Sequence, residues 1–172
     1  MSPLYVNVAN LNYVSTLVWQ CGSEMPSEQV IATIFSGLAG SLRSLRLSMP
    51  FVPDTLSLNN LLELDIHATQ CVTSPSIRSV ATRHPGLNSL VLRGFLIFTA
   101  EDAAAVLDSS PQLRRLEVET HQRGWGVVPS ALKVLARPGG KLCHLALSHC
   151  RESVPVPLMR NACLALLSLI HI

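Results

Sequence analysis

Leucine and other branched apolar residues recur along this chain in a short pattern, LxxLxL, with mostly polar residues between them. Clear copies are LRSLRL, LLELDI, LNSLVL, LRRLEV and LCHLAL, and VSTLVW is a weaker sixth copy. Their middle residues stand at positions 17, 45, 64, 90, 116 and 145, which are separated by 28, 19, 26, 26 and 29 residues. The alternation predicts a β-strand with one buried face in each copy, and a step of this length indicates a structural repeat.

The segments between the copies carry helix signals. Ser74 stands as N-cap before Pro75 in one segment, and Thr99 stands as N-cap three residues before Asp102 in another. SEQVIATIFSGLAG has an apolar face of helical period, and Gly37 and Gly40 predict where that helix ends. The 19-residue step leaves room only for a short turn through DTLSLNN. The predicted unit is therefore a helix or turn, a stop and a strand, and stacking buries what one unit alone leaves exposed.

With these segments in view, LRSLRL, LNSLVL, LRRLEV and LCHLALSHC resemble the leucine-rich-repeat superfamily, and the last copy fits LxxLxLxxC with Cys150 at the usual Asn or Cys position. HPGLNSLVL and SPQLRRLEV are similar to the repeats of fungal F-box/leucine-rich-repeat proteins. The resemblance implies an α/β leucine-rich-repeat solenoid, a horseshoe arc with a parallel sheet on its concave face and helices on its convex face. About six irregular repeats would occupy residues 1–166 of a partial chain.

The same resemblance implies a scaffold for protein interaction, the substrate-recognition part of an F-box-type ubiquitin ligase component. The ligase adaptor would then be bound through an F-box that this chain lacks. MPSEQVIATIF is similar to the start of an F-box, but the strand pattern that follows it favours a repeat helix. The alternative is a leucine-rich-repeat binding module without a ubiquitin link, such as an immune-type receptor or a regulator of a small GTPase. The fold alone does not choose between these functions.

Composition narrows the function classes. Of the 172 residues, 48% are apolar and 14% are charged, which excludes a disordered tail. The net charge of +2 is spread without a basic block, so we expect no nucleic-acid partner. A signal peptide, a membrane span and CxxC pairs are not recognisable, so we expect an intracellular protein, cytoplasmic or nuclear, with free cysteines.

Known chemical motifs are missing from the chain. It contains no GxSxG, HExxH or phosphate-loop pattern, so we expect no enzyme and no cofactor. Cys143, His144, His149 and Cys150 are close in sequence, but a strand would point them to different faces, so we expect no metal site. The last six residues, LSLIHI at 167–172, are the translation of a transposon end used in sequencing libraries. We therefore expect an adapter scar there.

The outward strand positions are the candidate partner-binding surface, because side chains between the buried leucines point away from the core. The charged and imidazole side chains on the concave face are Arg46, Asp65, His67, Arg93, Arg115, Glu117 and Glu119. A purely structural role is the competing interpretation, in which Arg46 pairs with Asp65 and Arg93 with Glu119 as solvated salt bridges. In the loop THQRGWGVV, Arg123 and Trp125 form a second candidate contact for a partner protein, against the alternative that the tryptophan is buried.

Overall fold

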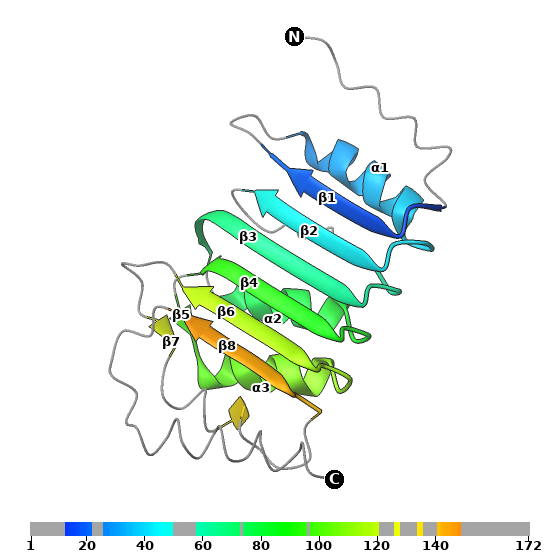
Figure 1. Ribbon diagram of the computed structural model, residues 1–172. Helices are drawn as coiled ribbons and strands as arrows, with labels where there is room; N and C mark the ends of the chain where they lie inside the picture. Colours follow the sequence, from blue (N-terminus) through cyan, green and yellow to red (C-terminus); the bar gives the residue numbers. More distant parts are fainter. Residues whose placement is uncertain are drawn as a thin grey trace.

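The computed structural model describes residues 13–21, 26–49, 58–72, 74–95, 97–120, 126–127, 134–135 and 141–148. The described strands are β1 (Thr16–Gln20), β2 (Ser44–Met49), β3 (Glu63–Val72), β4 (Ser89–Phe95), β5 (Ile97–Phe98), β6 (Arg115–Thr120), β7 (Gly126–Val127) and β8 (His144–Ser148). The described helices are α1 (Glu28–Leu38), α2 (Ser74–Arg83) and α3 (Ala100–Ser109). Strands β5 and β7 form a small parallel pair at one end of the larger sheet (Figure 1).

The larger sheet has six strands in the order β1-β2-β3-β4-β6-β8, and every neighbouring pair is parallel. Its register aligns the middle residues of the six LxxLxL copies, namely Leu17, Leu45, Leu64, Leu90, Leu116 and Leu145. The predicted mixed α/β class and the predicted parallel sheet are therefore confirmed. The 19-residue step between Leu45 and Leu64 keeps the common register in spite of its shorter connection.

One backbone hydrogen-bond arrangement repeats at the start of each strand of the larger sheet after β1. The carbonyl oxygen just before a strand accepts two successive N–H groups from the next unit, as when Arg43 accepts from Leu62 at 2.8 Å and from Glu63 at 3.0 Å. The carbonyls that do this are those of Ser15, Arg43, Leu62, Asn88 and Arg114. The units are thus equivalent in backbone geometry as well as in sequence, and their carbonyl groups are satisfied between units.

The helices begin at local capping signals. The Ser27 side chain accepts from the Val30 N–H at the start of α1, and Thr99 forms a full capping box with Asp102 at the start of α3, as predicted. Helix α2 begins at Ser74 itself rather than after it. Helix α1 ends at Leu38, between Gly37 and Gly40, the two glycines that were expected to mark its end. None of the described helices is long and apolar enough to cross a membrane.

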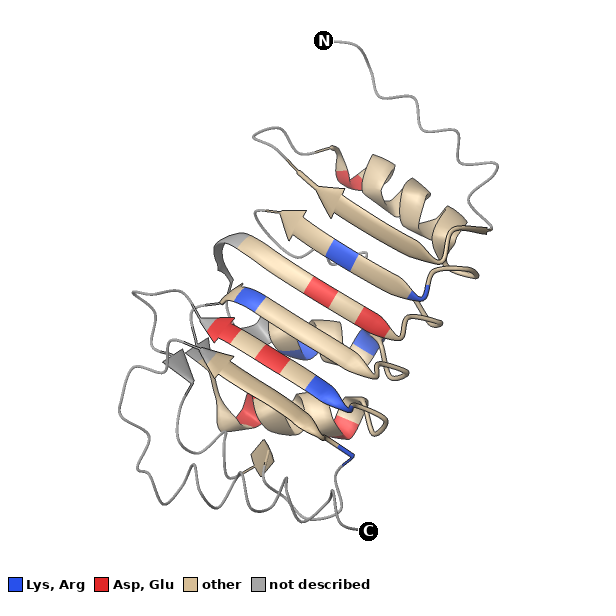
Figure 2. Cartoon of the chain, in the orientation of Figure 1, with Lys and Arg blue, Asp and Glu red and all other residues tan. Residues whose placement is uncertain are grey.

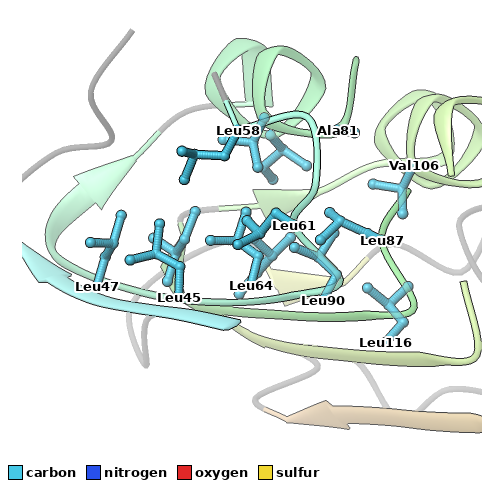
Figure 3. Close-up of a cluster of buried hydrophobic side chains, with 14 of the residues drawn as sticks. Leu45, Leu47, Leu58, Leu61, Leu64, Ala81, Leu87, Leu90, Val106 and Leu116 are labelled. Atoms are coloured by element: carbon cyan, nitrogen blue, oxygen red, sulfur yellow. The ribbon is translucent and has the colours of Figure 1, made fainter. Parts of the chain in front are cut away.

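The core lies between one face of the sheet and the helices. The first leucine of each clear LxxLxL copy is 2% exposed or less: Leu42, Leu61, Leu87, Leu113 and Leu142. Ala81 of α2 and Val106 of α3 face the strand leucines in the same cluster (Figure 3). Full burial of a leucine side chain stabilises by about 1.5–3 kcal/mol relative to exposure. The repeated leucines are therefore the main stabilising element of the fold.

A column of polar contacts joins three units inside this core. His84 Nδ1 lies 3.2 Å from the Leu58 carbonyl oxygen, 26 positions earlier, and so carries the proton in this hydrogen bond. The Ser110 hydroxyl donates to the His84 carbonyl at 3.3 Å, again 26 positions away. Burial lowers the pKa of His84 below its ordinary value of 6.5, since the Leu58 carbonyl only partly offsets the cost of a buried charge and Arg83 adds repulsion.

An ion pair links α2 to α3. Arg78 Nε donates to Asp102 Oδ1 at 3.1 Å, and Arg78 also pairs with Glu101 at 2.8 Å. The Asp102 side chain is fully buried, and its second oxygen accepts from the Thr99 N–H at 2.8 Å and from the Thr99 hydroxyl at 2.7 Å. The Asp102 hydrogen bond and the nearby carboxylates raise the pKa of Arg78 above its usual range. Asp102 therefore caps α3 and ties it to α2.

Candidate protein-binding face

The side of the sheet that faces away from the helices carries ordered polar side chains. We call it the charged sheet face and define it by the outward residues of the six strands. The register sets them in three rows across the sheet: Thr16, Ser44, Glu63, Ser89, Arg115 and His144; Val18, Arg46, Asp65, Val91, Glu117 and Ala146; Gln20, Ser48, His67, Arg93 and Glu119. The basic position of β2 and that of β4 lie on either side of the acidic positions of β3, and β6 carries both signs (Figure 2).

Asp65 lies between two arginines on neighbouring strands. Arg46 Nε donates to Asp65 Oδ2 at 2.9 Å from β2, and Arg93 Nη1 donates to Asp65 Oδ1 from β4. The Asp65 side chain is 13% exposed, while that of Arg46 is 64% exposed. The carboxylate is thus largely covered by its two partners, and the outer arginine remains open to solvent.

Glu117 is the second carboxylate at the centre of several pairs. It pairs with Arg115 on its own strand, with His144 Nε2 of β8 at 3.2 Å and with Arg93 at 3.7 Å. Arg93 also reaches Glu119 at 3.6 Å. Arg93 therefore contacts carboxylates on both of its neighbouring strands and joins the pairs into one chain from β2 to β8.

Two shallow hollows lie on the charged sheet face, and each has a volume of about 260 Å³. The first is lined by residues of β1 to β4, including Arg46, Ser48 and His67. The second is lined by residues of β4, β6 and β8, including Glu117, Glu119 and Ala146. Arg93 lines both hollows. The face is therefore not flat, and Arg93 lies between its two hollows.

All seven concave-face candidates lie on this face: Arg46, Asp65, His67, Arg93, Arg115, Glu117 and Glu119. The expected pairing of Arg46 with Asp65 is present, and Arg93 does reach Glu119, but Arg93 also donates to Asp65. The second candidate group, Arg123 and Trp125, lies outside the described residues. The same holds for Cys150 and for the expected adapter scar at 167–172.

Three residues of the charged sheet face were not among the site residues predicted from the sequence, although the strand pattern puts them on the outward side of the sheet. Gln20 and Ser48 line the first hollow, and His144 contacts Glu117. Their positions in the LxxLxL pattern, level with the predicted site residues on neighbouring strands, could have identified them as site residues. Val91 is the opposite case, since it takes an outward position and is only 7% exposed. It lies level with Asp65 and Glu117, and the Arg93 side chain spans toward both of these carboxylates.

The strand that carries Arg93 bends directly after it. The parallel register of β4 shifts between Arg93 and Phe95 on the β6 side, and β3 shifts after His67 on the other side. Gly94 lies at this shift with φ of +81°, and a Cβ built there would meet the Ala68 carbonyl oxygen at 1.9 Å. Only glycine fits this backbone conformation and this close approach. The irregularity therefore sets the direction of the chain next to Arg93.

Thiols and imidazoles do not gather on the described part of the chain. No group of three or more His, Cys, Asp or Glu side chains in this part could hold a metal ion. Cys21 and Cys143 are both free, and Cys143 donates to the Arg114 carbonyl at 3.3 Å. Partial burial raises the pKa of the Cys21 thiol above its usual value. The organised chemistry of the described face is therefore that of charge and hydrogen bonding.

Comparison with known proteins places the fold. No family model matches the chain, and no curated protein matches it. A solved structure, Leiomodin-1 Actin-Binding Site 2, is similar with a TM-score of 0.50 and 12% sequence identity. The similarity covers 95% of this chain and 87% of that one. It supports a leucine-rich-repeat type of fold, in agreement with the repeated strand pattern.

Proposed function

We propose that this chain is a leucine-rich-repeat solenoid that binds another protein through the charged sheet face, and that it acts by binding and not by catalysis. The observation that carries the proposal is the chain of ion pairs centred on Arg93, which presents ordered charges beside two hollows. Charged groups held in place before association lose less freedom on binding than mobile ones. Electrostatic complementarity of this kind supplies specificity and a fast association rate.

The opposite side of the sheet supports the same assignment. Helices cover it, and the leucine core occupies the space between. The open side carries the charges, so the two sides differ in role. Stacked repeats form extended binding surfaces in this way, since each unit contributes one strand to a common face. Cys21 and Cys143, the two cysteines whose thiols the structure describes, are free, which favours an intracellular setting for the interaction.

Two more specific functions are candidates within this proposal, and each implies a different kind of partner. Substrate recognition for an F-box ubiquitin ligase rests on the resemblance of HPGLNSLVL and SPQLRRLEV, while an immune-type receptor or a GTPase regulator rests on the repeat class alone. Actin enters as a defined probe because the similar structure is named as an actin-binding site, although 12% identity extends only to the fold. Co-expression of the gene that encodes this chain with a ligase adaptor, followed by co-purification, separates the first function from the others.

Site-specific cross-linking tests the face directly. A photo-reactive phenylalanine replaces Ala146, an exposed outward residue of β8, and in a control chain it replaces Asp108, an exposed residue of α3. Both chains are irradiated with cell extract and, separately, with purified filamentous actin. We expect a discrete adduct from position 146 that is lost in the Arg93→Glu background. Identical adducts from both positions would count against the proposed function. So would an adduct from position 146 that forms equally well in the Arg93→Glu background.

A further inference from the structure

The two hollows of the charged sheet face have opposite electrostatic character. The first contains Arg46 and Arg93 with one carboxylate, Asp65. The second contains Arg93 with two carboxylates, Glu117 and Glu119. Arg93 donates to Asp65 and lies 3.6–3.7 Å from the glutamates, so its charge is shared between the two hollows. Among the charged residues that line each hollow, positive charge is therefore in excess at the first and negative charge at the second.

The first hollow has unused hydrogen-bond donors. Arg46 uses only Nε within the described part of the chain, which leaves the four N–H groups of its two terminal nitrogens without a partner there. Its side chain is 64% exposed, so those nitrogens are accessible. Ser48 and His67 line the same hollow. A planar guanidinium edge of this kind matches the two oxygens of a carboxylate.

The second hollow has an unused acceptor. Glu119 is 48% exposed, and its nearest cation in the described part of the chain is Arg93 at 3.6 Å, beyond hydrogen-bond distance. Glu117 lies beside it with 21% of its side chain exposed, and it already pairs with Arg115, with His144 and, at a longer distance, with Arg93. Ala146 offers only a methyl group at the adjacent strand, so a long side chain has room to approach. An ammonium or guanidinium group fits these two carboxylates.

We infer that the partner is a protein segment that places an acidic side chain over Arg46 and a basic side chain over Glu117 and Glu119. This inference rests on the proposed function and adds the charge order. Arg46 on β2 and Glu117 on β6 share a row and are three strand spacings apart, which is about 14 Å. An extended segment covers that distance in four to five residues at about 3.3 Å each.

The test is selection of a displayed library of random 12-residue peptides on the full 172-residue chain. Parallel selections use Arg46→Glu, Glu119→Arg and, as a control of matched charge change, Arg114→Glu, which alters an exposed residue just before β6. Peptides from the wild-type selection are then measured against these four chains and against Arg93→Glu, which reports whether they bind the charged sheet face. We expect an acidic residue three to five positions from a basic one, and about tenfold weaker binding to Arg46→Glu and to Glu119→Arg. Arg114→Glu should bind within about twofold of wild type.

The outcomes separate this inference from the proposed function. Peptides that bind the face, as judged by loss on Arg93→Glu, but show no acidic and basic pairing would overturn the charge order and leave a binding face. Peptides unaffected by any variant of the face, or the absence of enrichment, would overturn both. Reversed preference on the double variant Arg46→Glu/Glu119→Arg, with basic and acidic residues exchanged, is the strongest supporting result.

Discussion

Replacing Gly94 with alanine perturbs the fold at the bend next to Arg93. The new Cβ would lie 1.9 Å from the Ala68 carbonyl oxygen, whereas ordinary contact begins at 3.4 Å, so β3 and β4 must separate by about 1.5 Å at this point. The residue also has φ of +81°, which an L side chain rarely adopts. The position of the Cβ is fixed by the backbone and its neighbour is a backbone oxygen, so no side-chain rotation can relieve the clash.

The expected loss of stability follows from these two terms. The left-handed conformation costs about 1–2 kcal/mol for a residue with a Cβ. Separation of the strands weakens the hydrogen bonds next to the bend at about 1 kcal/mol each. We therefore expect Gly94→Ala to lower the free energy of unfolding by about 3–4 kcal/mol, a large part of the 5–15 kcal/mol that is typical of a domain. The midpoint of thermal unfolding should fall by about 10 °C.

Urea unfolding followed by far-ultraviolet circular dichroism measures this loss, with Gly40→Ala as the matched control. A Cβ at Gly40 meets no atom within 4 Å, and its φ lies outside the left-handed range. Gly40→Ala should therefore leave the unfolding midpoint unchanged or raise it slightly, because alanine restricts the unfolded chain. If Gly94→Ala were as stable as Gly40→Ala, the bend and the close approach of β3 and β4 would be wrong.

Two further predictions concern buried polar groups. Asp102→Ala should lower the free energy of unfolding by about 3 kcal/mol, because the Thr99 N–H and hydroxyl lose their acceptor. Arg78→Ala should lower it less, and urea unfolding of both variants measures the difference. The His84 imidazole has a lowered pKa when folded, so the unfolded chain binds more protons below pH 6.5, and stability should fall as the pH drops through and below that value. Thermal unfolding between pH 7.5 and 5 should show a smaller drop in His84→Gln than in wild type, and equal drops would refute this role of His84.

The strands and their alignment could be predicted from the sequence because both depend on a period. Alternating apolar residues specify which side of a strand is buried, and stacked units bury the same positions in one layer. The register therefore follows from the positions of Leu17 to Leu145, whatever the length of the connections. The capping box of Thr99 and Asp102 was also predictable, since its hydrogen bonds join residues three apart.

Glycine positions were less informative. Gly37 and Gly40 lie on either side of the observed end of α1 at Leu38, but Gly37 is still helical and Gly40 does not adopt the left-handed conformation. Gly94 carries the positive φ, and the sequence around it reads as an ordinary strand. A glycine in the sequence shows only that a positive φ is permitted at that position. Whether that conformation is used depends on the neighbouring strand, here on Ala68 of β3.

The sequence determined which residues lie on the charged sheet face. The tertiary structure decided which of them form ion pairs with one another. The period of two by itself places Arg46, Asp65 and Arg93 on one side of a sheet. The preference of Arg93 for Asp65, with Glu119 farther away, follows from the reach and direction of a long side chain between parallel strands. Such distances depend on twist, bends and strand spacing, which are properties of the assembled sheet and have no counterpart in a repeat pattern.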